Sequence, residues 1–442
     1  MRSIRFVTTV ATAVLGVAVL NPAPVSAQGG AATVLFDMEA VRHRPTMGKD
    51  KTPIGTATLV EGKVGKACRF AFTDGAKSGF FTASVRPSPA WDKAGGLSFW
   101  VKGDGSSSFG GLELIDASNY ALRYGYCFPI DSTEWREVTV PWRDLVPELP
   151  AGQLVGGEKG YAPSKFGNLW FGKWYYWRDY PACSFSIDQI ALEPEIAVDR
   201  TDYTPPGPGT PRLLARLKAS KPVTIVTMGD SLSDKRHWAN RKVLWSELLA
   251  ATLGKRFGGK VTLVNPAIGG TQLTQNLVLM PRWLKDTPRP DLVTVWFGYN
   301  DWSSGMRGPH FRTMLRFAVD RIRRMTGGRS EVLLITTCPA LARWDTMEEL
   351  AEAVRAVAAE KKTGLADVSA AFHQAGADAV ARPKLYVWDK THLGPAGHEL
   401  AAEIVARAIA DPQDTPKLSA QQTAGTAPGL MRLSTTDKER DP

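Results

Sequence analysis

The sequence predicts two domains: an all-β domain with a β-sandwich or jelly-roll fold, followed by an α/β domain with a parallel sheet. The chain has 442 residues, which is long for a single domain. In its first half, short segments of alternating apolar and polar residues are separated by clusters of Gly, Asp, Ser and Pro. In its second half, β-branched runs alternate with segments of helical period, which is typical of strands joined by crossover helices. A linker rich in Pro and Gly at 201–219 separates the two patterns.

Residues 1–27 have the pattern of a secretory signal peptide. Arg2 and Arg5 give a basic start, residues 6–20 form an apolar core, and small residues end at Ala27, where we expect cleavage. A membrane anchor would need a longer apolar run. We therefore expect a protein secreted to the periplasm or the extracellular space, with no membrane span.

The composition is that of a globular protein, with 43% hydrophobic and 22% charged residues and a formal net charge of +10. Because we expect an exported protein, we do not expect nucleic acid as a partner, despite this positive charge. A solvated basic surface is the simpler interpretation, and attraction to acidic polymers is the alternative. The oligomeric state stays open. The four cysteines, at 68, 127, 183 and 338, allow at most one disulfide within the first domain, and the sequence does not give its pairing.

Residues 28–200 are predicted to form the β-sandwich domain. The clearest strand is 97–102, where apolar side chains alternate. The parity of the apolar positions slips between Ile187 and Ile190, which predicts a β-bulge at Asp188. The other expected strands are 34–36, 68–72, 112–115, 120–128, 135–140, 169–174 and 183–192.

Residues 220–411 are predicted to form the α/β domain. Its crossovers should be right-handed, and both faces of the sheet should be covered by helices. Residues 412–442 are polar and lack an apolar period, so we expect a disordered tail there. The expected strands are 223–228, 261–265, 292–297, 332–336 and 365–368, and the expected helices are 242–253, 311–325, 346–362 and 396–410.

The stretch Gly-Asp-Ser-Leu-Ser at 229–233 follows the first strand of this second domain. Gly229 permits a sharp turn, and we expect Asp230 and Ser231 to bond the local backbone and to start a helix. Ser231 would then lie at the carboxyl end of a parallel sheet, where open α/β folds bind ligands. On its own, the stretch fits an ordinary strand-to-helix turn equally well.

Three later segments make Ser231 a candidate nucleophile: Asn-Pro-Ala-Ile-Gly-Gly-Thr at 265–271, Gly-Tyr-Asn-Asp at 298–301 and Asp-Lys-Thr-His-Leu at 389–393. Ser, Gly, Asn and His in this order resemble the GDSL or SGNH family of serine hydrolases, over roughly residues 220–410. The second segment departs from the family pattern, because Pro follows its Asn and Gly stands where many members have Ser. The resemblance implies a flavodoxin-like sheet with strand order 2-1-3-4-5 and an esterase activity.

His392 is the candidate general base for Ser231, since a serine hydroxyl needs a base to become nucleophilic. Asp389 precedes it by three residues and is placed to bind the second ring nitrogen and fix the tautomer. His237 is the alternative base because it lies close to Ser231 in the sequence.

The resemblance also implies three donors for the oxyanion that forms when an acyl carbonyl is attacked. They are the backbone N–H of Ser231, the backbone N–H of Gly270 and the side chain of Asn300. Three tryptophans close to the motifs are candidates for the wall of an acyl or sugar pocket, with ordinary packing as the alternative: Trp238, Trp302 and Trp388. The predicted chemistry needs no cofactor.

Segments of the first domain resemble the galactose-binding-like jelly rolls that serve as carbohydrate-binding modules. The likeness rests on residues 35–39, 98–103 and 185–190. Such modules often carry a structural calcium, and the resemblance makes the carboxylates of Asp37, Glu39 and Asp188 its candidate ligands. The alternative is that they are ordinary turn and edge carboxylates.

The most aromatic stretch of the chain is 170–180. Flat rings with a polar atom suit stacking on sugar faces. We expect Tyr175, Tyr176 and Trp177 to lie in an exposed loop and to contact sugar, or else to pack against the catalytic domain and shape its cleft.

Together these features predict a secreted serine esterase that removes small acyl groups, with acetyl as the expected group, from polysaccharide or oligosaccharide. Two alternatives stay open at this point. One is a lipid or aryl esterase whose β domain is structural. The other is a carbohydrate-binding protein with a silent hydrolase domain, against which the intact set Ser231, Asn300, Asp389 and His392 argues. The sequence does not name the polymer or the position of the ester.

Overall fold

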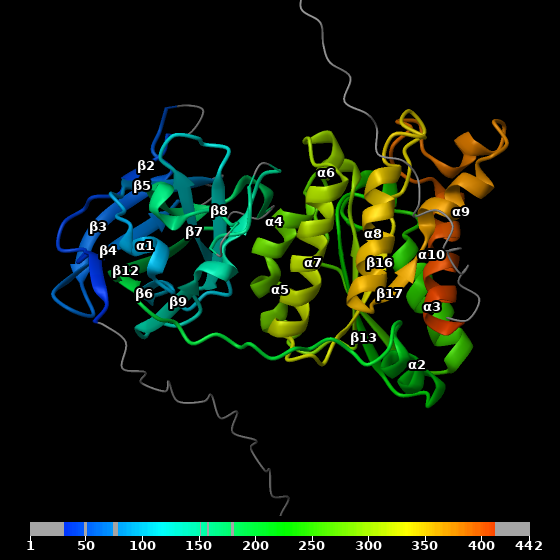
Figure 1. The fold of residues 1–442 in the computed structure, drawn as a ribbon, viewed down its shortest axis with the longest axis horizontal. Coiled ribbons are helices and arrows are strands. Elements are labelled where there is room, and N and C mark those ends of the chain that lie inside the picture. Colours follow the sequence, from blue (N-terminus) through cyan, green and yellow to red (C-terminus); the bar gives the residue numbers. More distant parts are fainter. Residues whose placement is uncertain are drawn as a thin grey trace, which may run out of the picture. The chain divides into compact units, whose positions relative to one another are not determined.

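The computed structural model divides the chain into two compact units, the first ending at Asp202 and the second beginning at Tyr203 (Figure 1). The predicted signal peptide at 1–27 and the predicted tail at 412–442 lie outside the described residues. Within the described part, no helix is both long and apolar enough to cross a membrane. The structure describes residues 31–47, 51–73, 78–150, 152–156, 159–177 and 181–411.

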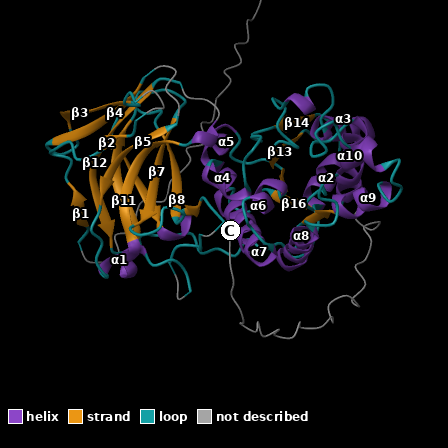
Figure 2. Ribbon diagram, turned by 90° about the horizontal axis from the view of Figure 1, so that it is seen from above, coloured by secondary structure: helices purple, strands orange, loops and turns teal. Residues whose placement is uncertain are grey.

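The first unit consists of antiparallel sheets (Figure 2). One sheet has the order β3 (Gly55–Glu61), β4 (Lys66–Phe72), β12 (Cys183–Glu193), β6 (Gly96–Lys102) and β9 (Arg136–Pro141), with β1 (Thr33–Phe36) also paired to β12. The other has the order β10 (Val146–Pro147), β8 (Arg123–Pro129), β7 (Phe109–Asp116), β11 (Phe166–Lys173), β5 (Gly79–Ser84) and β2 (Arg44–Pro45). The short helical elements are α1 (Ala90–Lys93), η1 (Trp142–Asp144), η2 (Pro163–Lys165) and η3 (Tyr175–Trp177).

Aromatic side chains from both sheets form the core of this unit, because the strands alternate as the sequence predicts. Phe70 of β4 stacks on Phe171 of β11, with 5.8 Å between ring centroids. Phe99 of β6 meets Phe171 edge to face at 5.4 Å. The predicted all-β fold class is confirmed.

The predicted bulge on β12 is also confirmed. The pairing of β12 with β6 shifts register between Asp188 and Ala191, and Gln189 has φ of +46°. The extra residue accounts for the change of parity that the apolar pattern shows.

The second unit contains a parallel sheet with the order β14-β13-β15-β16-β17. This is the order 2-1-3-4-5 that the family resemblance implies, so the predicted α/β class is confirmed. The strands are β13 (Val223–Gly229), β14 (Val261–Val264), β15 (Leu292–Trp296), β16 (Glu331–Ile335) and β17 (Gly364–Ala366).

Helices cover both faces of this sheet. Helices α2, α3 and α10 lie on one side, and α4, α7 and α8 lie on the other (Figure 2). Their bounds are α2 (Pro211–Lys218), α3 (Trp245–Phe257), α4 (Leu273–Val278), α5 (Met280–Asp286), α6 (Tyr299–Ser303), α7 (Gly308–Met325), α8 (Glu348–Lys361), α9 (Val368–Ala375) and α10 (Pro395–Ala410), with 3-10 turns η4 (Trp238–Asn240) and η5 (Arg382–Leu385).

One sequence prediction needs correction here. The predicted linker at 201–219 contains helix α2, whose Leu213 and Leu217 are buried in the core of the second unit. Proline at the first helical position and apolar residues four apart explain why this segment folds. The sequence allows at most one disulfide in the first domain, and in the structure all four cysteines are buried and none forms a disulfide.

Candidate active site

Ser231 lies at the carboxyl end of β13, in a tight turn. A side chain at Gly229 would place its Cβ 2.5 Å from the Ser233 Oγ atom, so this position requires glycine. The Asp230 Oδ1 atom accepts the Leu232 N–H at 2.9 Å, and the Asn240 Nδ2 atom donates to the Ser231 carbonyl at 2.6 Å. The prediction that a helix starts at this turn is wrong, because α3 begins only at Trp245. Side-chain bonds, rather than a helix, hold the turn.

Asp389 and His392 lie in a short hairpin closed by a bridge between Tyr386 and Leu393. The Asp389 Oδ1 atom accepts the backbone N–H of Thr391 at 3.0 Å and of His392 at 2.9 Å. Its Oδ2 atom is 2.5 Å from the His392 Nδ1 atom. Burial raises the pKa of the Asp389 carboxyl, but these hydrogen bonds outweigh it and hold the pKa below its ordinary value. The carboxylate is therefore ionised and fixes the ring.

The hairpin brings His392 to Ser231, although the two residues are far apart in the sequence. The His392 Nε2 atom is 2.8 Å from the Ser231 Oγ atom. With the Nδ1 proton directed at Asp389, Nε2 is left as the acceptor for the serine hydroxyl proton. This arrangement has the geometry of an activated nucleophile with its base and an orienting carboxylate.

Gly270 lies in the loop that follows β14, beside the serine turn. The loop is tied to that turn by the Ile268 N–H, which donates to the Gly229 carbonyl at 3.1 Å, and by the Gly269 N–H, which donates to Asp234 Oδ2 at 2.9 Å. Gly270 has φ of +79°, a conformation that favours glycine. The residue is exposed, so its backbone can approach a ligand closely.

Asn300 stands in the first turn of α6 and reaches the same loop. Its Nδ2 atom donates to the Thr271 carbonyl at 3.0 Å and lies 3.5 Å from the Asp230 Oδ2 atom. The side-chain amide thus lies next to the residue that follows Gly270 and the residue that precedes Ser231. The structure brings together all the residues proposed from the sequence for the nucleophile, the base and the oxyanion donors.

Two buried carboxyl groups lie beneath this arrangement. Burial raises the pKa of Asp230 to about 7. Burial and the charge of Asp230 raise the pKa of Asp301 to about 7 as well. Asp301 Oδ1 accepts the Leu273 N–H at 3.0 Å, which fixes the start of α4 beside the site.

His237 also lies at this site, although the sequence suggested it only as an alternative base. The ring of His237 stacks on the ring of His392, with 4.1 Å between centroids. The Nδ1 atom of His237 accepts the Ala239 N–H at 3.4 Å. The closeness of His237 to Ser231 in the sequence could have indicated that it lies at the site. Its stacking on His392 could not be predicted, because it depends on where the hairpin with Asp389 and His392 docks. Asn240, which holds the Ser231 carbonyl, gave no sequence signal at all.

The three candidate pocket tryptophans have different surroundings. Trp238 meets His392 edge to face at 5.9 Å, and Trp388 stacks on Trp238 at 5.3 Å. Trp302 instead carries the guanidinium groups of Arg307 and Arg343 on its ring, at 5.3 and 5.2 Å. The structure therefore places Trp238 beside His392, with Trp388 stacked on it.

The expected exposed aromatic loop at 175–177 is a buried 3-10 turn, which corrects the sequence prediction. Tyr176 and Trp177 are 2% and 3% exposed. Their rings pack on that of Trp174, at 6.0 and 5.1 Å. Because Tyr176 and Trp177 are buried and pack on Trp174, their ring faces are not exposed to a sugar in this conformation. Tyr175 lies in the same turn, and its side chain is outside the described part.

The three carboxylates predicted to bind calcium are engaged with backbone N–H groups. Glu39 Oε1 accepts the Lys66 N–H, and Asp188 Oδ2 accepts the Val64 N–H, both at 2.9 Å. Asp37 Oδ1 accepts the Glu39 N–H at 3.2 Å. Among the residues that the structure describes, no three His, Cys, Asp or Glu side chains form a group able to hold a metal ion. Calcium remains a prediction from the sequence.

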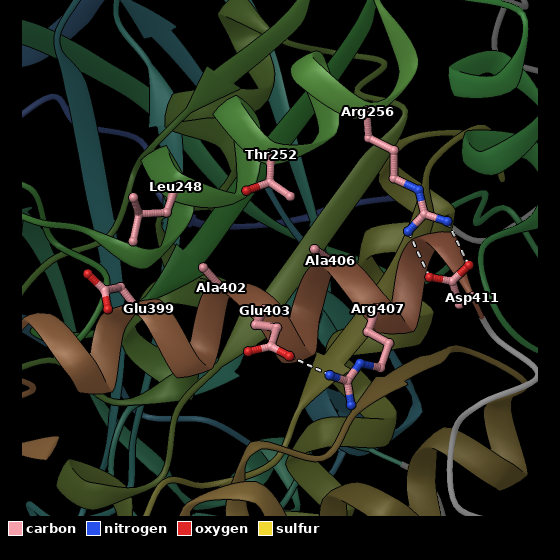
Figure 3. Close-up of a pocket in the computed structure, with 9 residues that line it drawn as sticks. All are labelled: Leu248, Thr252, Arg256, Glu399, Ala402, Glu403, Ala406, Arg407 and Asp411. Atoms are coloured by element: carbon pink, nitrogen blue, oxygen red, sulfur yellow. Dashed lines mark hydrogen bonds and ion pairs between the residues drawn. The ribbon is translucent and has the colours of Figure 1, made fainter.

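A hollow of about 340 Å³ lies between α3 and α10, apart from the candidate site, and Figure 3 labels the residues that line it. Four of its charged residues are paired with one another: Arg256 forms two hydrogen bonds of 2.7 Å with Asp411, and Arg407 pairs with Glu403. None of Ser231, Asp389 or His392 lines it.

Residues 227–400 match the family model described as GDSL-like Lipase/Acylhydrolase family. A comparison with curated proteins found no match. Solved structures similar to this chain include a lipase/acylhydrolase from Enterococcus faecalis, with 22% identity over 44% of this chain and 98% of the other and a TM-score of 0.36. An acetylxylan esterase from Geobacillus stearothermophilus has 21% identity over 42% and 94% of the two chains, with a TM-score of 0.35. A family 11 carbohydrate-binding module from Clostridium thermocellum has 20% identity over 38% and 97%, with a TM-score of 0.30.

Proposed function

Starting from the GDSL-like lipase/acylhydrolase domain that residues 227–400 form, we propose that this hydrolase is a secreted serine esterase that removes O-acetyl groups from polysaccharide or oligosaccharide. The observation that carries the proposal is the continuous chain of contacts from Ser231 Oγ to His392 Nε2, at 2.8 Å, and from His392 Nδ1 to Asp389 Oδ2, at 2.5 Å. An alcohol, an imidazole and a carboxylate in this order are the groups that acyl transfer through a serine requires.

In the proposed first half-reaction, Ser231 Oγ attacks the carbonyl carbon of the ester while His392 Nε2 takes the hydroxyl proton. The resulting imidazolium is stabilised by the carboxylate of Asp389. The backbone N–H groups of Ser231 and Gly270 and the side-chain amide of Asn300 stabilise the negative charge on the former carbonyl oxygen. When the tetrahedral intermediate collapses, the sugar hydroxyl leaves with the proton from His392, and the acyl group stays on Ser231.

In the second half-reaction a water molecule attacks the acyl-enzyme. His392 takes one proton of this water, and a second tetrahedral intermediate forms in the same set of donors. Its collapse releases the carboxylic acid, which is acetic acid for an acetyl ester, and returns the proton to Ser231 Oγ. Every proton is carried by His392, so no cofactor enters the proposed cycle.

The carbohydrate part of the proposal is supported by two features of the chain. The first unit is a β-sandwich whose sequence resembles carbohydrate-binding modules. The N-terminal sequence has the pattern of an export signal, and extracellular glycans are common substrates for exported hydrolases that carry such a module. This is an association of domains, and a substrate panel has to test it.

The test of the nucleophile is Ser231→Ala, assayed with p-nitrophenyl acetate. We expect kcat to fall by about 10³ or more, because Ser231 Oγ is the hydroxyl in contact with His392 Nε2. Ser88→Ala, which changes an exposed serine of the first unit, is the matched control and should keep full activity. A serine-reactive phosphonate should add its mass to the wild type and to the control but not to Ser231→Ala. Full turnover by Ser231→Ala would remove Ser231 from its role.

The test of the substrate class compares acetate release from acetylated xylan, pectin and mannan with hydrolysis of long-chain fatty-acyl esters. The proposal requires a higher kcat/KM for at least one acetylated glycan. A preference for the fatty-acyl esters would favour a lipid esterase with a structural β-sandwich. Export is tested separately, by sequencing the N-terminus of the protein recovered outside the cytoplasm, which should begin at Gln28.

A further inference from the structure

Two tryptophans beside the base are exposed. Trp388 is 81% exposed and Trp238 is 42% exposed. Trp238 belongs to η4, which follows the serine turn, and Trp388 immediately precedes Asp389 in the hairpin. Two indole rings from distant parts of the chain thus come together in solvent, next to the reacting groups.

The rings form an ordered array. Trp388 stacks on Trp238 with 5.3 Å between centroids and 23° between planes. Trp238 in turn meets the ring of His392 edge to face, at 5.9 Å and 63°. The order Trp388, Trp238, His392 runs from the open surface to the catalytic imidazole. These rings give the site an aromatic surface on the side of the hairpin.

Folding does not account for the exposure of these rings. A tryptophan that serves the core is buried, as Trp245 and Trp296 are in this unit. Single exposed apolar residues are common, but two large exposed rings stacked beside a reacting group mark a ligand-binding surface. Burying part of either ring against a ligand would also remove apolar surface from water.

We propose that Trp388 and Trp238 form a platform that binds the flat face of a pyranose ring whose ester group is held at Ser231. This inference rests on the proposed esterase function and names the group that the site recognises. The axial C–H groups of a pyranose give one face an apolar character that matches an indole ring, while the indole N–H stays available for a sugar hydroxyl. The rings flank the base, which must return a proton to the sugar oxygen, so a sugar on this platform has its leaving oxygen on the side of His392.

The experiment compares wild type, Trp388→Ala and Trp388→Phe on an acetylated xylo-oligosaccharide and on p-nitrophenyl acetate. Trp388 is chosen because its high exposure makes its loss harmless to folding. For Trp388→Ala we expect KM for the oligosaccharide to rise roughly ten-fold with kcat changed far less, and Trp388→Phe should recover part of the loss because it retains a ring. Val380→Ala, at a 72% exposed apolar residue of the same unit, is the control and should match the wild type.

A second measurement separates binding from turnover. Tryptophan fluorescence is followed while the oligosaccharide is added to Ser231→Ala and to the double variant Ser231→Ala/Trp388→Ala. The single variant should bind, and the double variant should bind roughly ten-fold more weakly. If the wild type cleaves the oligosaccharide and Trp388→Ala has an unchanged KM, the platform is wrong and the proposed function stands. If Ser231→Ala binds more tightly than the double variant but the wild type does not cleave, the platform stands and the glycan-esterase function is wrong. If neither binding nor cleavage occurs, both are wrong.

Discussion

Replacing Asp389 by Asn tests how much the carboxylate contributes to the base. An Asn side chain has nearly the same shape, and its Oδ1 atom can still accept the N–H groups of Thr391 and His392 that now bind Asp389. The hairpin should therefore keep its fold. What changes is the group that faces the His392 Nδ1 atom, now 2.5 Å from a carboxylate oxygen. An amide N–H there would favour the tautomer with the proton on Nε2, where it blocks proton transfer from Ser231.

The size of the effect follows from the charge interaction that is lost in the transition state. An imidazolium and a carboxylate with charge centres about 4 Å apart, at an effective dielectric of about 20, attract each other by about 4 kcal/mol. The side chains of His392 and Asp389 are only 17% and 19% exposed, so solvent weakens this interaction little. Because each 1.4 kcal/mol corresponds to a factor of about ten in rate, kcat should fall by about 10³, within a range of about 10² to 10⁴.

The assay is the initial rate of p-nitrophenyl acetate hydrolysis as a function of pH, with circular dichroism to show that the variant is folded. Asp378→Asn is the matched control, since this exposed carboxylate also accepts a backbone N–H in a turn, from Val380 at 2.9 Å. The control should have wild-type kcat. A loss smaller than ten-fold in folded Asp389→Asn would refute the role assigned to the carboxylate.

Two further predictions concern the side-chain amide of Asn300 and the buried carboxyl group of Asp301. Asn300→Ala should lower kcat by about 10²–10³ with little change in KM for p-nitrophenyl acetate, because an oxyanion donor acts mainly in the transition state; an unchanged kcat would exclude this role. Burial raises the pKa of Asp301 from 3.8 to about 7, so the folded state binds more protons than the unfolded state between these values, and stability falls as the pH rises through this window. Asp301→Asn should flatten that fall, by at least about 1 kcal/mol between pH 4.5 and 7.5 in urea unfolding, whereas an equal slope in both proteins would contradict the shift.

The sequence was sufficient for the fold class because the central strands are buried on both faces or alternate clearly. β15 and β16 are buried along their whole length, and such apolar runs are easily recognised. β3 escaped recognition because it is an edge strand with mostly exposed side chains. Helix α2 was hidden by the proline-rich segment before it, since composition alone does not tell that Leu213 and Leu217 reach a core.

For the candidate site, the motifs name the residues, but only the fold gives their contacts. The offset of Asp389 from His392 is local and readable. The stacking of His237 on His392 depends on where a hairpin arrives from the other end of the domain. The same limitation explains the error at Tyr176 and Trp177: their pattern fits a sugar-binding loop, but their burial depends on Trp174, which packs against both.

The closed hairpin from Tyr386 to Leu393 has a consequence for how the activity should be lost on heating. The spacing between imidazole and carboxylate is set by backbone bonds within the hairpin and survives as long as the hairpin does. The spacing between imidazole and hydroxyl depends on how two separate loops are docked, through the 2.8 Å contact and the ring contacts of His237 and Trp238 with the hairpin. Mild warming should therefore separate the Ser231 hydroxyl from a His392–Asp389 pair that is still intact. The protein should then lose activity at a lower temperature than the one at which it unfolds globally.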